Sequence, residues 1–381
     1  MSLRPCEISM IISNLTLQQF RCFTQQEYFF DGRVIIIEGP NGSGKSSLLE
    51  ALHYGCYLRS FRTHVHKELI PFGVDHFFFK IGFFQEQTAT HDSIQVGYSP
   101  SDGKVVKYNQ NVIGTYKDLV SSFRIVTLSA DDISLVQGAP ELRRDFLNYA
   151  LMLSNPALLP LFKNYKSVLT QRNSLLFKNA RSGGSFPKEF DVWTESLWRG
   201  AQELSMHRIT YLSALETELN ELLKAYFGPS SSVSFIYQPC NIRLDHTFDQ
   251  FKGASGALFS RELEQGRSLF GAHLDDVSIF FQDKRARLYA SRGQQKLLVL
   301  LIKIAQLKAL CAKGEGGVLL LDDFVTDFDS VKVGQALEVI KSLKFQIFIS
   351  SPVDTTPFLG GIPKNDQSRV LISDLSRDQN S

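Results

Sequence analysis

The sequence lacks the cysteine patterns that build disulfide frameworks or zinc sites. It has 5 cysteines in 381 residues, none of them spaced as C-x-x-C, and an odd number leaves one unpaired in any disulfide scheme. This pattern favours a reducing compartment and excludes a disulfide scaffold. His64 and His66 lie close together, but no cysteine or second histidine pair stands nearby at ligand spacing, so we expect loop or surface residues there.

Long apolar runs and a strong excess of one charge are also missing. No uncharged apolar segment approaches the roughly 20 residues that cross a bilayer, and no basic segment followed by an apolar core opens the chain. We therefore expect a cytoplasmic protein with no membrane partner. The formal net charge of +2 does not by itself indicate nucleic-acid binding, which would need a local basic face.

The clearest positive signal is the glycine-rich loop at residues 39–46. It follows an apolar strand at residues 34–37 and opens a helical pattern at residues 47–57, which is the order that defines a phosphate-binding P-loop. Glycines let backbone N–H groups and a helix N-terminus face a polyphosphate, whereas a glycine-rich turn without a ligand is the alternative. The expected nucleotide-binding residues here are Gly39, Pro40, Asn41, Gly42, Ser43, Gly44, Lys45, Ser46 and Ser47.

Two acidic residues follow a second apolar strand, at residues 318–321, in the arrangement called Walker B. Lys45 is expected to reach the β and γ phosphates, and the hydroxyl of Ser46 and the carboxylate of Asp322 to hold Mg²⁺, which prefers oxygen ligands. Asp323 is the predicted catalytic residue that orients the attacking water, because phosphoryl transfer depends mainly on positioning and charge. The alternative for such a pair is a solvated loop start.

The segment at residues 291–295 precedes a strongly apolar helix and places a hydroxyl, a glycine and free N–H groups at its N-terminus. We interpret it as a second anion site. Because the P-loop already surrounds the phosphates from one side, this segment is most useful if it covers the γ-phosphate of a nucleotide bound to another molecule. An ordinary N-cap at Ser291 is the alternative.

The order of predicted elements indicates an α/β fold whose core is divided in the sequence. Residues 11–108 are mostly strand, the helical stripes at residues 141–153, 157–180 and 189–227 follow, and buried parallel strands return at residues 318–321 and 346–350. The two ends of the chain therefore belong together. We predict an ATPase lobe at residues 1–112 and 270–381 and a mainly α-helical lobe inserted at residues 113–269.

Six motifs in this order and spacing resemble the RecF family. They stand at residues 39–46, 59–63, 131–144, 271–276, 291–295 and 319–323. The resemblance implies an ABC-type P-loop ATPase core with mixed sheets, related to the heads of Rad50 and SMC proteins. It also implies a weak, DNA-dependent ATPase of recombinational repair and replication restart. In such a protein ATP drives homodimerisation on DNA, slow hydrolysis releases the dimer, and RecR and RecO are partners.

By this resemblance, Ser291 and Gly293 contact the γ-phosphate of the partner's ATP, and Gln294 is a further nucleotide-binding residue of the same segment. Asp329 lies in a D-loop across the dimer interface. The chain departs from the family pattern in having Ala272 and Leu274 where a proline and an arginine are usual. Residues 326–329, the expected D-loop, read Thr-Asp-Phe-Asp where Ser-Glu-Leu-Asp is usual in the family. These departures concern the interface and not the phosphate or metal ligands.

Duplex or gapped DNA is the expected nucleic-acid partner, and basic side chains must neutralise its phosphates. The candidates are Arg59, Arg62, Arg143 and Arg144. For each of them, a surface position without DNA contact is the alternative. For Arg143 and Arg144, which precede an apolar helical stripe, the alternative is that one of the pair covers a carboxylate or the core. Two other functions also share the P-loop: a small-molecule kinase, which leaves residues 291–295 without a task, and a scaffold that binds ATP without hydrolysing it and recruits repair partners.

Overall fold

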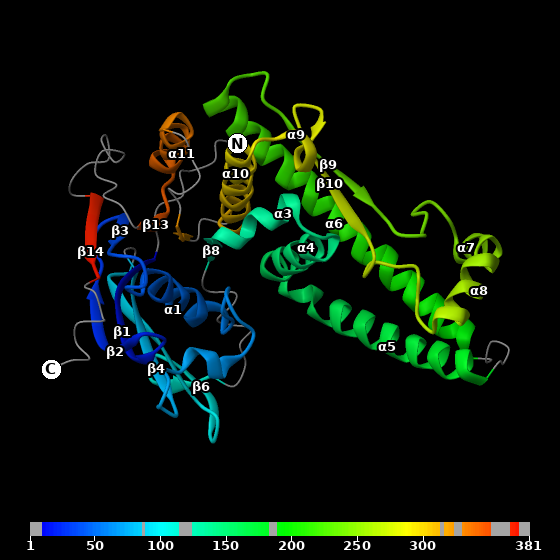
Figure 1. The fold of residues 1–381 in the computed structure, drawn as a ribbon, viewed down its shortest axis with the longest axis horizontal. Coiled ribbons are helices and arrows are strands. Elements are labelled where there is room, and N and C mark those ends of the chain that lie inside the picture. The colour runs from blue at the N-terminus through cyan, green and yellow to red at the C-terminus, as the bar shows by residue number, and fades with distance from the viewer. Residues whose placement is uncertain are drawn as a thin grey trace. The chain divides into compact units, whose positions relative to one another are not determined.

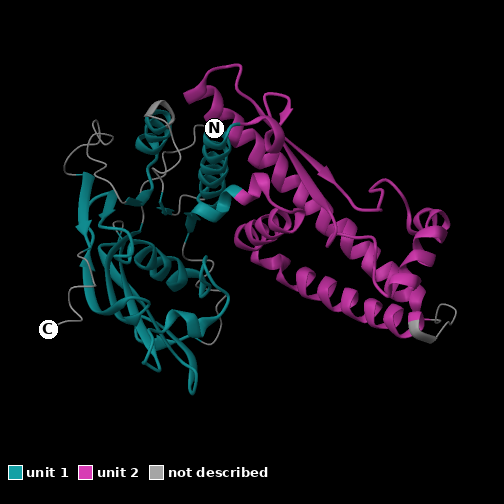
Figure 2. Ribbon diagram, viewed as in Figure 1, with its two compact units in different colours: residues 1–133, 291–381 teal, residues 134–290 magenta. Residues whose placement is uncertain are grey.

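The computed structural model describes residues 10–85, 88–113, 124–182, 189–312, 316–323, 330–351 and 366–372. These residues form two compact units (Figures 1 and 2): residues 1–133 with 291–381, and residues 134–290. Each unit is described by itself below. Within the described ranges, no helix combines the length and the hydropathy that crossing a bilayer requires.

Unit 1 contains a six-stranded sheet in the order β2-β1-β4-β5-β6-β7, whose paired strands are antiparallel. Phenylalanines fill its buried face: Phe20 contacts Phe77 and Phe79 edge to face at centroid distances of 5.3 and 5.4 Å. The predicted strand-rich character of this segment is confirmed. The strands are β1 (Ile11–Phe20), β2 (Phe23–Phe29), β4 (Phe77–Gln85), β5 (Thr90–Ser99), β6 (Gly103–Tyr108) and β7 (Asn111–Val112).

The second sheet of unit 1 is parallel and has the order β14-β3-β13-β12-β8. Its inner strands are apolar and almost wholly buried, as expected for a parallel sheet covered on both faces. The two predicted halves of the core therefore meet in one sheet. The strands are β3 (Val34–Glu38), β8 (Ile125–Leu128), β12 (Val318–Leu321), β13 (Gln346–Ser351) and β14 (Gln367–Leu371).

Two helices of unit 1 begin where local chemistry predicts. The helix α1 (Lys45–Tyr57) starts directly after Gly44, and α10 (Arg292–Leu310) starts after Ser291 with a capping box. The sequence reasoning did not anticipate the 3₁₀ helix η1 (His66–Leu69). The remaining helical elements described in this unit are η2 (Ala130–Ile133) and α11 (Ser330–Ser342).

Unit 2 is mainly helical. Its longest helix, α6, ends at Gly228 in agreement with the predicted stop, and α5 and α6 share a core with short helices farther along the chain. A three-stranded sheet, β11-β10-β9, completes the unit. Its elements are α3 (Ser134–Gln137), α4 (Pro140–Ser154), η3 (Pro156–Leu158), α5 (Leu159–Ser182), α6 (Phe190–Phe227), β9 (Val233–Gln238), α7 (Phe248–Ala254), α8 (Gly256–Gln265), β10 (Asp276–Phe281), β11 (Lys284–Arg285) and α9 (Ala286–Tyr289).

The division between the units lies about twenty residues later in the sequence than the predicted lobe edges at residues 113 and 270. The strand β8 pairs in parallel with β12, so residues 125–128 belong to the ATPase sheet. The strand β10 pairs with β9, so residues 276–281 belong to the helical unit. Both pairings join residues distant in sequence, which helical periodicity does not reveal. The predicted α/β class with mixed sheets and an inserted helical unit is present.

Candidate nucleotide site

The P-loop connects β3 to α1 and leaves the N-terminus of α1 without a side-chain cap. Gly44 occupies the N-cap position at φ 104°, and Gly42 has φ 84°, values that favour glycine. A Cβ on Gly42 would point into open space, whereas one on Gly44 would meet Cys22 Sγ and a ring carbon of Phe23 at 2.7 Å. The loop is therefore open to solvent at Gly42 and tightly packed against Cys22 and Phe23 at Gly44.

The side chain of Lys45 lies back over this loop. Its Nζ donates to the carbonyl oxygens of Gly39 and Pro40 at 2.7 and 2.8 Å. Burial lowers the pKa of Lys45, and the carboxylates of Asp323 and Asp322 act in the opposite direction. The ammonium group is thus held at the mouth of the loop, where a phosphate can replace the two carbonyl acceptors.

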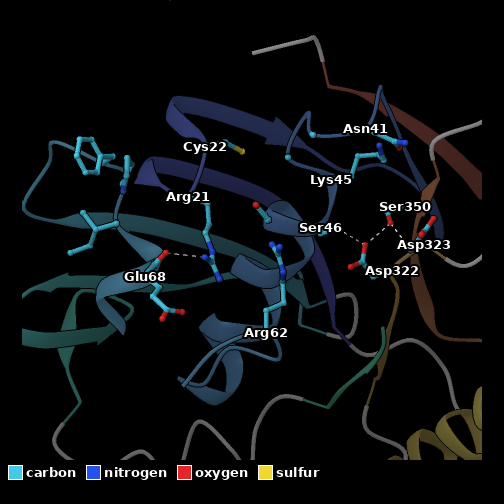
Figure 3. A pocket seen from close by; sticks show the side chains of 16 residues that line it. Arg21, Cys22, Asn41, Lys45, Ser46, Arg62, Glu68, Asp322, Asp323 and Ser350 are labelled. Atoms are coloured by element: carbon cyan, nitrogen blue, oxygen red, sulfur yellow. Dashed lines mark hydrogen bonds between the residues drawn. The ribbon is translucent and has the colours of Figure 1, made fainter. Parts of the chain in front are cut away.

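The two Walker B residues meet the P-loop through hydroxyl groups. Ser46 Oγ donates to Asp322 Oδ1 at 2.8 Å, and Ser350 Oγ, at the end of β13, donates to the same oxygen at 2.7 Å. Ser350 Oγ also accepts from the backbone N–H of Asp323 at 2.9 Å. One buried hydroxyl therefore fixes both acidic residues (Figure 3).

Asp323 adopts a left-handed backbone conformation, with φ 51°. Aspartate tolerates this region better than most residues because its short polar side chain can bond locally. The backbone is held from both sides, since its carbonyl accepts from Lys296 Nζ on α10 at 3.2 Å while Ser350 holds its N–H. The carboxylate is thereby aimed from a fixed turn, as a water-orienting group requires.

These residues fit Mg²⁺-ATP. A pocket of about 560 Å³ is lined by the P-loop, by Asp322 and Asp323, and by residues of the β1–β2 turn and of the segment after α1. The Oγ of Ser43, in the same loop, is buried without a hydrogen-bond partner in the described structure. Ser46 and Asp322 supply the hard oxygen ligands that Mg²⁺ prefers.

The structure brings together only part of the predicted nucleotide set. Asn41, Gly42, Gly44, Lys45, Ser46 and Ser47 line the pocket with the two acidic residues. Gly39, Pro40 and Ser43 are not among the lining residues. At Gly39, a Cβ would meet the carbonyl oxygen of Ile372 at 2.6 Å. Asp329 lies outside the described residues.

Ser291, Gly293 and Gln294 belong to unit 1 but are not among the residues that line this pocket. Ser291 Oγ accepts from the N–H of Gln294 at 3.3 Å, and Gln294 Oε1 accepts from the N–H of Ser291 at 2.8 Å. The ordinary N-cap predicted as the alternative is therefore present. Ser291 is also exposed to solvent, so a contact from another molecule can reach it.

Two residues that line the pocket, Arg21 and Ser350, were not predicted from the sequence. Arg21, in the β1–β2 turn, pairs with the wholly buried carboxylate of Glu50 on α1 through two hydrogen bonds of 2.7 and 2.8 Å. Ser350 is the second. Neither belongs to a recognisable local motif, and only the tertiary contact gives these residues a role.

The four arginines considered for DNA binding have different surroundings. Arg62 lines the nucleotide pocket, with Nη1 3.6 Å from Glu50 Oε2, and Arg59 is exposed. Arg143 is buried and bound to both carboxylate oxygens of Asp276, at 2.7 and 3.1 Å. Arg144 donates to the backbone carbonyl of Asp275 at 2.8 Å. For Arg143, the structure therefore shows the alternative, pairing with a carboxylate, in place of the expected DNA contact. Its guanidinium charge is neutralised by Asp276 inside unit 2.

Comparison with known proteins gives a consistent result. Residues 11–356 match the family model described as RecF/RecN/SMC N terminal domain. The chain is 30% identical to the DNA replication and repair protein RecF of Chloroherpeton thalassium over 350 residues, which are 90% of this chain and 95% of the relative. It is 31% identical to the RecF protein of Halalkalibacterium halodurans over 375 residues, 97% of this chain and 98% of the relative.

The chain belongs to the RecF family. A solved structure described as the recombination mediator protein RecF with ATP in the RecFOR pathway is 25% identical, with a TM-score of 0.79, and covers 93% of this chain and 95% of its own. A second, described as RecF-ATPrS, has a TM-score of 0.80 at 23% identity and shares the fold. The resemblance to RecF, and with it an ATP-binding, ABC-type core, is confirmed.

The RecF motif at residues 271–276 has a structural role in unit 2. Asp275 is buried and accepts hydrogen bonds from Ser205, from the N–H of Cys240 at 2.7 Å and from the hydroxyl of Tyr237. Asp276 binds Arg143. The acidic pair of this motif thus ties β10 to the helices of its own unit, and the altered positions Ala272 and Leu274 are not part of these bonds.

We expect Ser350→Ala to reduce the turnover number of ATP hydrolysis about tenfold with little change in KM. The substitution removes the hydrogen bonds to Asp322 Oδ1 and to the N–H of Asp323, and a lost hydrogen bond of about 1 kcal/mol or more corresponds to such a factor. Steady-state phosphate release measures both constants. Ser350→Thr keeps the hydroxyl and should retain most turnover; equal losses in the two variants would contradict this positioning role.

Proposed function

We propose that the protein is an ATP-gated, DNA-binding dimer of recombinational repair and replication restart. ATP bound at the P-loop of one protomer is covered by the N-terminus of α10 of the other, and slow hydrolysis releases the pair from DNA. The catalytic group is Asp323, and Mg²⁺ is held by Ser46 and Asp322. ATPase activity is weak and stimulated by DNA.

The observation that carries this proposal is the exposed, capped N-terminus of α10. This helix has 19 residues, and Ser291 and Arg292 at its start are exposed to solvent. Residues 291–294 do not line the pocket of their own protomer. A helix N-terminus favours anions. A γ-phosphate presented by a second molecule is a ligand that this geometry can accept.

We propose that basic side chains contact the phosphates of duplex or gapped DNA. The affinity of such contacts falls as the salt concentration rises. Of the four arginines, Arg59 is the one we retain for this role, because its side chain is exposed to solvent at the surface of unit 1. RecR and RecO are the proposed protein partners. The support is the RecFOR pathway named for a solved relative.

The proposal is tested by placing a negative charge at the cap. Aspartate and asparagine both serve as N-caps, so Ser291→Asp and Ser291→Asn preserve the helix start, while only aspartate repels a phosphate. With Mg²⁺-ATP, static light scattering should show the wild type and the asparagine variant approaching twice the 43.0 kDa of one chain. We expect the aspartate variant to require at least about tenfold more protein to dimerise.

The comparison with ADP, with no nucleotide and with duplex DNA across a salt series completes this experiment. Dimerisation of the wild type should need ATP and should strengthen with DNA at low salt. If Ser291→Asp dimerises with ATP as readily as Ser291→Asn, the cap does not meet a phosphate and the proposed clamp is wrong. A wild type that stays monomeric with ATP and DNA would contradict the dimer altogether.

A further inference from the structure

The three-stranded sheet of unit 2 has two outer edges that are covered differently. Its order is β11-β10-β9, so β9 forms one edge and lies beside α6 (Figure 1). Side chains of α6 bond to the backbone of β9. Asn220 accepts from the N–H of Val233 at 2.8 Å and donates to its carbonyl at 2.9 Å. Glu216 accepts from the N–H of Phe235 at 2.8 Å. This edge is therefore closed to another strand.

The opposite edge is covered over only part of its length. The strand β11 has two residues and pairs with Phe280 and Phe281 alone, because the chain leaves the sheet at Ala286 to begin α9. Residues 276–279 of β10 therefore have β9 on one side and, within the part of unit 2 that the structure describes, no strand on the other. This open stretch is about 13 Å long, at about 3.3 Å per residue.

The hydrogen-bond register shows which backbone groups face the open stretch. Gln282, directly after β10, donates its N–H to the carbonyl of Ser232 at 2.9 Å. Residues that bond to the neighbouring strand alternate along an antiparallel pair, so Val277 and Ile279 point their backbone groups away from β9. The N–H of Val277 is already bound by Asp276 Oδ1 at 2.7 Å. The carbonyl of Val277 and the N–H of Ile279 thus face the open side.

A cavity of about 330 Å³ lies along this stretch, and all four residues 276–279 belong to its lining. Successive side chains of a strand point to opposite faces of a sheet, so a cavity that touches four consecutive residues follows the backbone edge of the strand. We call this cavity the β10 groove. All of its lining residues belong to unit 2.

The rest of the groove combines positive charge with apolar surface. Arg285 on β11 and Arg287 on α9 are exposed, and neither forms an ion pair with a residue that the structure describes. Arg143 also lines the groove, but its charge is compensated by Asp276 at 2.7 Å. Three arginines against one aspartate give the lining a net formal charge of +2. Leu288, which is 68% exposed, adds an apolar surface beside the arginines.

We propose that the β10 groove binds an extended acidic segment of a partner protein, which adds a strand to the open edge of β10. In this mode of recognition, main-chain hydrogen bonds supply affinity and side-chain contacts supply specificity. Carboxylates of the segment bind Arg285 and Arg287, and an apolar side chain of the segment packs on Leu288. The proposal does not depend on the bound nucleotide or on the ATP-dependent dimer, because the groove is built by unit 2 alone.

The strand edge favours a peptide over a nucleic acid. The carbonyl of Val277 needs a hydrogen-bond donor, and the N–H of Ile279 needs an acceptor. Every residue of a peptide except proline offers both groups on its backbone. The sugar-phosphate backbone of DNA offers phosphate oxygens, which accept hydrogen bonds and can pair with the arginines but not with the carbonyl. A peptide therefore uses both the charge and the strand edge of the groove.

The test measures binding of a fluorescein-labelled octapeptide of alternating aspartate and valine to the full-length protein by fluorescence anisotropy, without nucleotide. The double variant Arg285→Ala/Arg287→Ala removes the charge of the groove. Arg243→Ala/Arg267→Ala is the matched control, because it removes the same charge from exposed positions of unit 2 outside the groove. We expect the groove variant to bind the peptide at least about tenfold more weakly and the control to stay within about twofold of the wild type.

A second probe separates strand addition from attraction between charges. The same peptide with every backbone amide N-methylated keeps its carboxylates and loses its backbone donors, so we expect it to bind the wild type at least about tenfold more weakly. Equal affinity of the two peptides would overturn the added strand. Equal affinity of the groove variant and the control variant would overturn the role of Arg285 and Arg287.

Two further outcomes would overturn the proposal as a whole. One is the absence of saturable binding of the acidic peptide to the wild type at concentrations up to about 1 mM. The other is a labelled DNA oligonucleotide that binds the groove variant more weakly than the control while the peptide does not, because the groove would then be a nucleic-acid contact. Both arginines of the groove variant are exposed, so its tryptophan fluorescence and urea midpoint should match those of the wild type.

Discussion

Replacing Asp323 with asparagine is expected to stop ATP turnover while ATP binding persists. The two side chains have nearly the same shape, and asparagine also tolerates the left-handed backbone found here, φ 51°. The hydrogen bonds from Lys296 Nζ and to Ser350 Oγ are made by the backbone of residue 323, so they survive the change. The variant therefore removes the charge of the carboxylate and keeps these two bonds.

The expected loss in turnover number is about 10²- to 10⁴-fold, the usual contribution of a positioned acid or base. Because hydrolysis is the proposed release step, the ATP-bound dimer should accumulate and dissociate more slowly. Single-turnover phosphate release and light scattering on the same sample measure both effects. Asp323→Glu retains a carboxylate and should keep part of the turnover, whereas unchanged hydrolysis in the asparagine variant would exclude Asp323 as the catalytic group.

The sequence predicts the P-loop and the Walker B strand well because both are local. An apolar strand followed by glycines, a lysine and a helix needs no information from elsewhere in the chain to be recognised. The same applies to the end of α6 at Gly228 and to the cap of α10 at Ser291. In each case the controlling interactions lie within a few residues.

Contacts between distant segments are what sequence reasoning misses. Ser350 is 28 residues from Asp322, and Arg21 is 29 residues from Glu50, and nothing in their neighbouring residues marks them as parts of one site. The strand β8 is short and falls between segments of other character, so its place beside β12 depends on pairing over a long separation. For this reason the predicted lobe edges, at residues 113 and 270, precede the observed edges at residues 134 and 291.

Arg143 illustrates how exposure is misjudged. In the sequence it is a candidate contact to DNA phosphates, with pairing to a carboxylate as the alternative. Yet it lies on the buried side of α4, where its guanidinium binds Asp276 through two hydrogen bonds and the carbonyl of Gly138 through a third. Whether a helical side chain is buried depends on the surface that packs against that side of the helix. For Arg143 this surface includes Asp276, which comes 133 residues later in the chain.

Unit 2 contains a second buried arginine on which its stability should depend. Arg172 on α5 and Glu262 on α8 are both 0% exposed, and two hydrogen bonds of 3.1 and 2.6 Å join them. The rings of Phe190 and Phe270 lie within 4.6 and 4.8 Å of the guanidinium carbon. The charge is thus surrounded by an apolar core and compensated almost entirely by one carboxylate.

We expect Arg172→Met to lower the free energy of unfolding of unit 2 by about 3–5 kcal/mol, because Glu262 would be left as a buried charge without its partner. Both tryptophans of the chain, Trp193 and Trp198, lie on α6 in this unit, so their fluorescence during urea denaturation reports on it selectively. Arg199→Met is the matched control. Its exposed pair with Glu195 should contribute at most about 0.5 kcal/mol.

Adding Glu262→Gln to Arg172→Met removes the stranded charge while keeping an oxygen for the N–H of Leu269, which donates to this side chain at 2.6 Å. The double variant should therefore recover a large part of the lost stability. If the double variant is no more stable than Arg172→Met alone, the loss comes from packing against the phenylalanine rings and not from the unpaired carboxylate. If Arg172→Met unfolds at the same urea concentration as Arg199→Met, the buried ion pair does not stabilise unit 2.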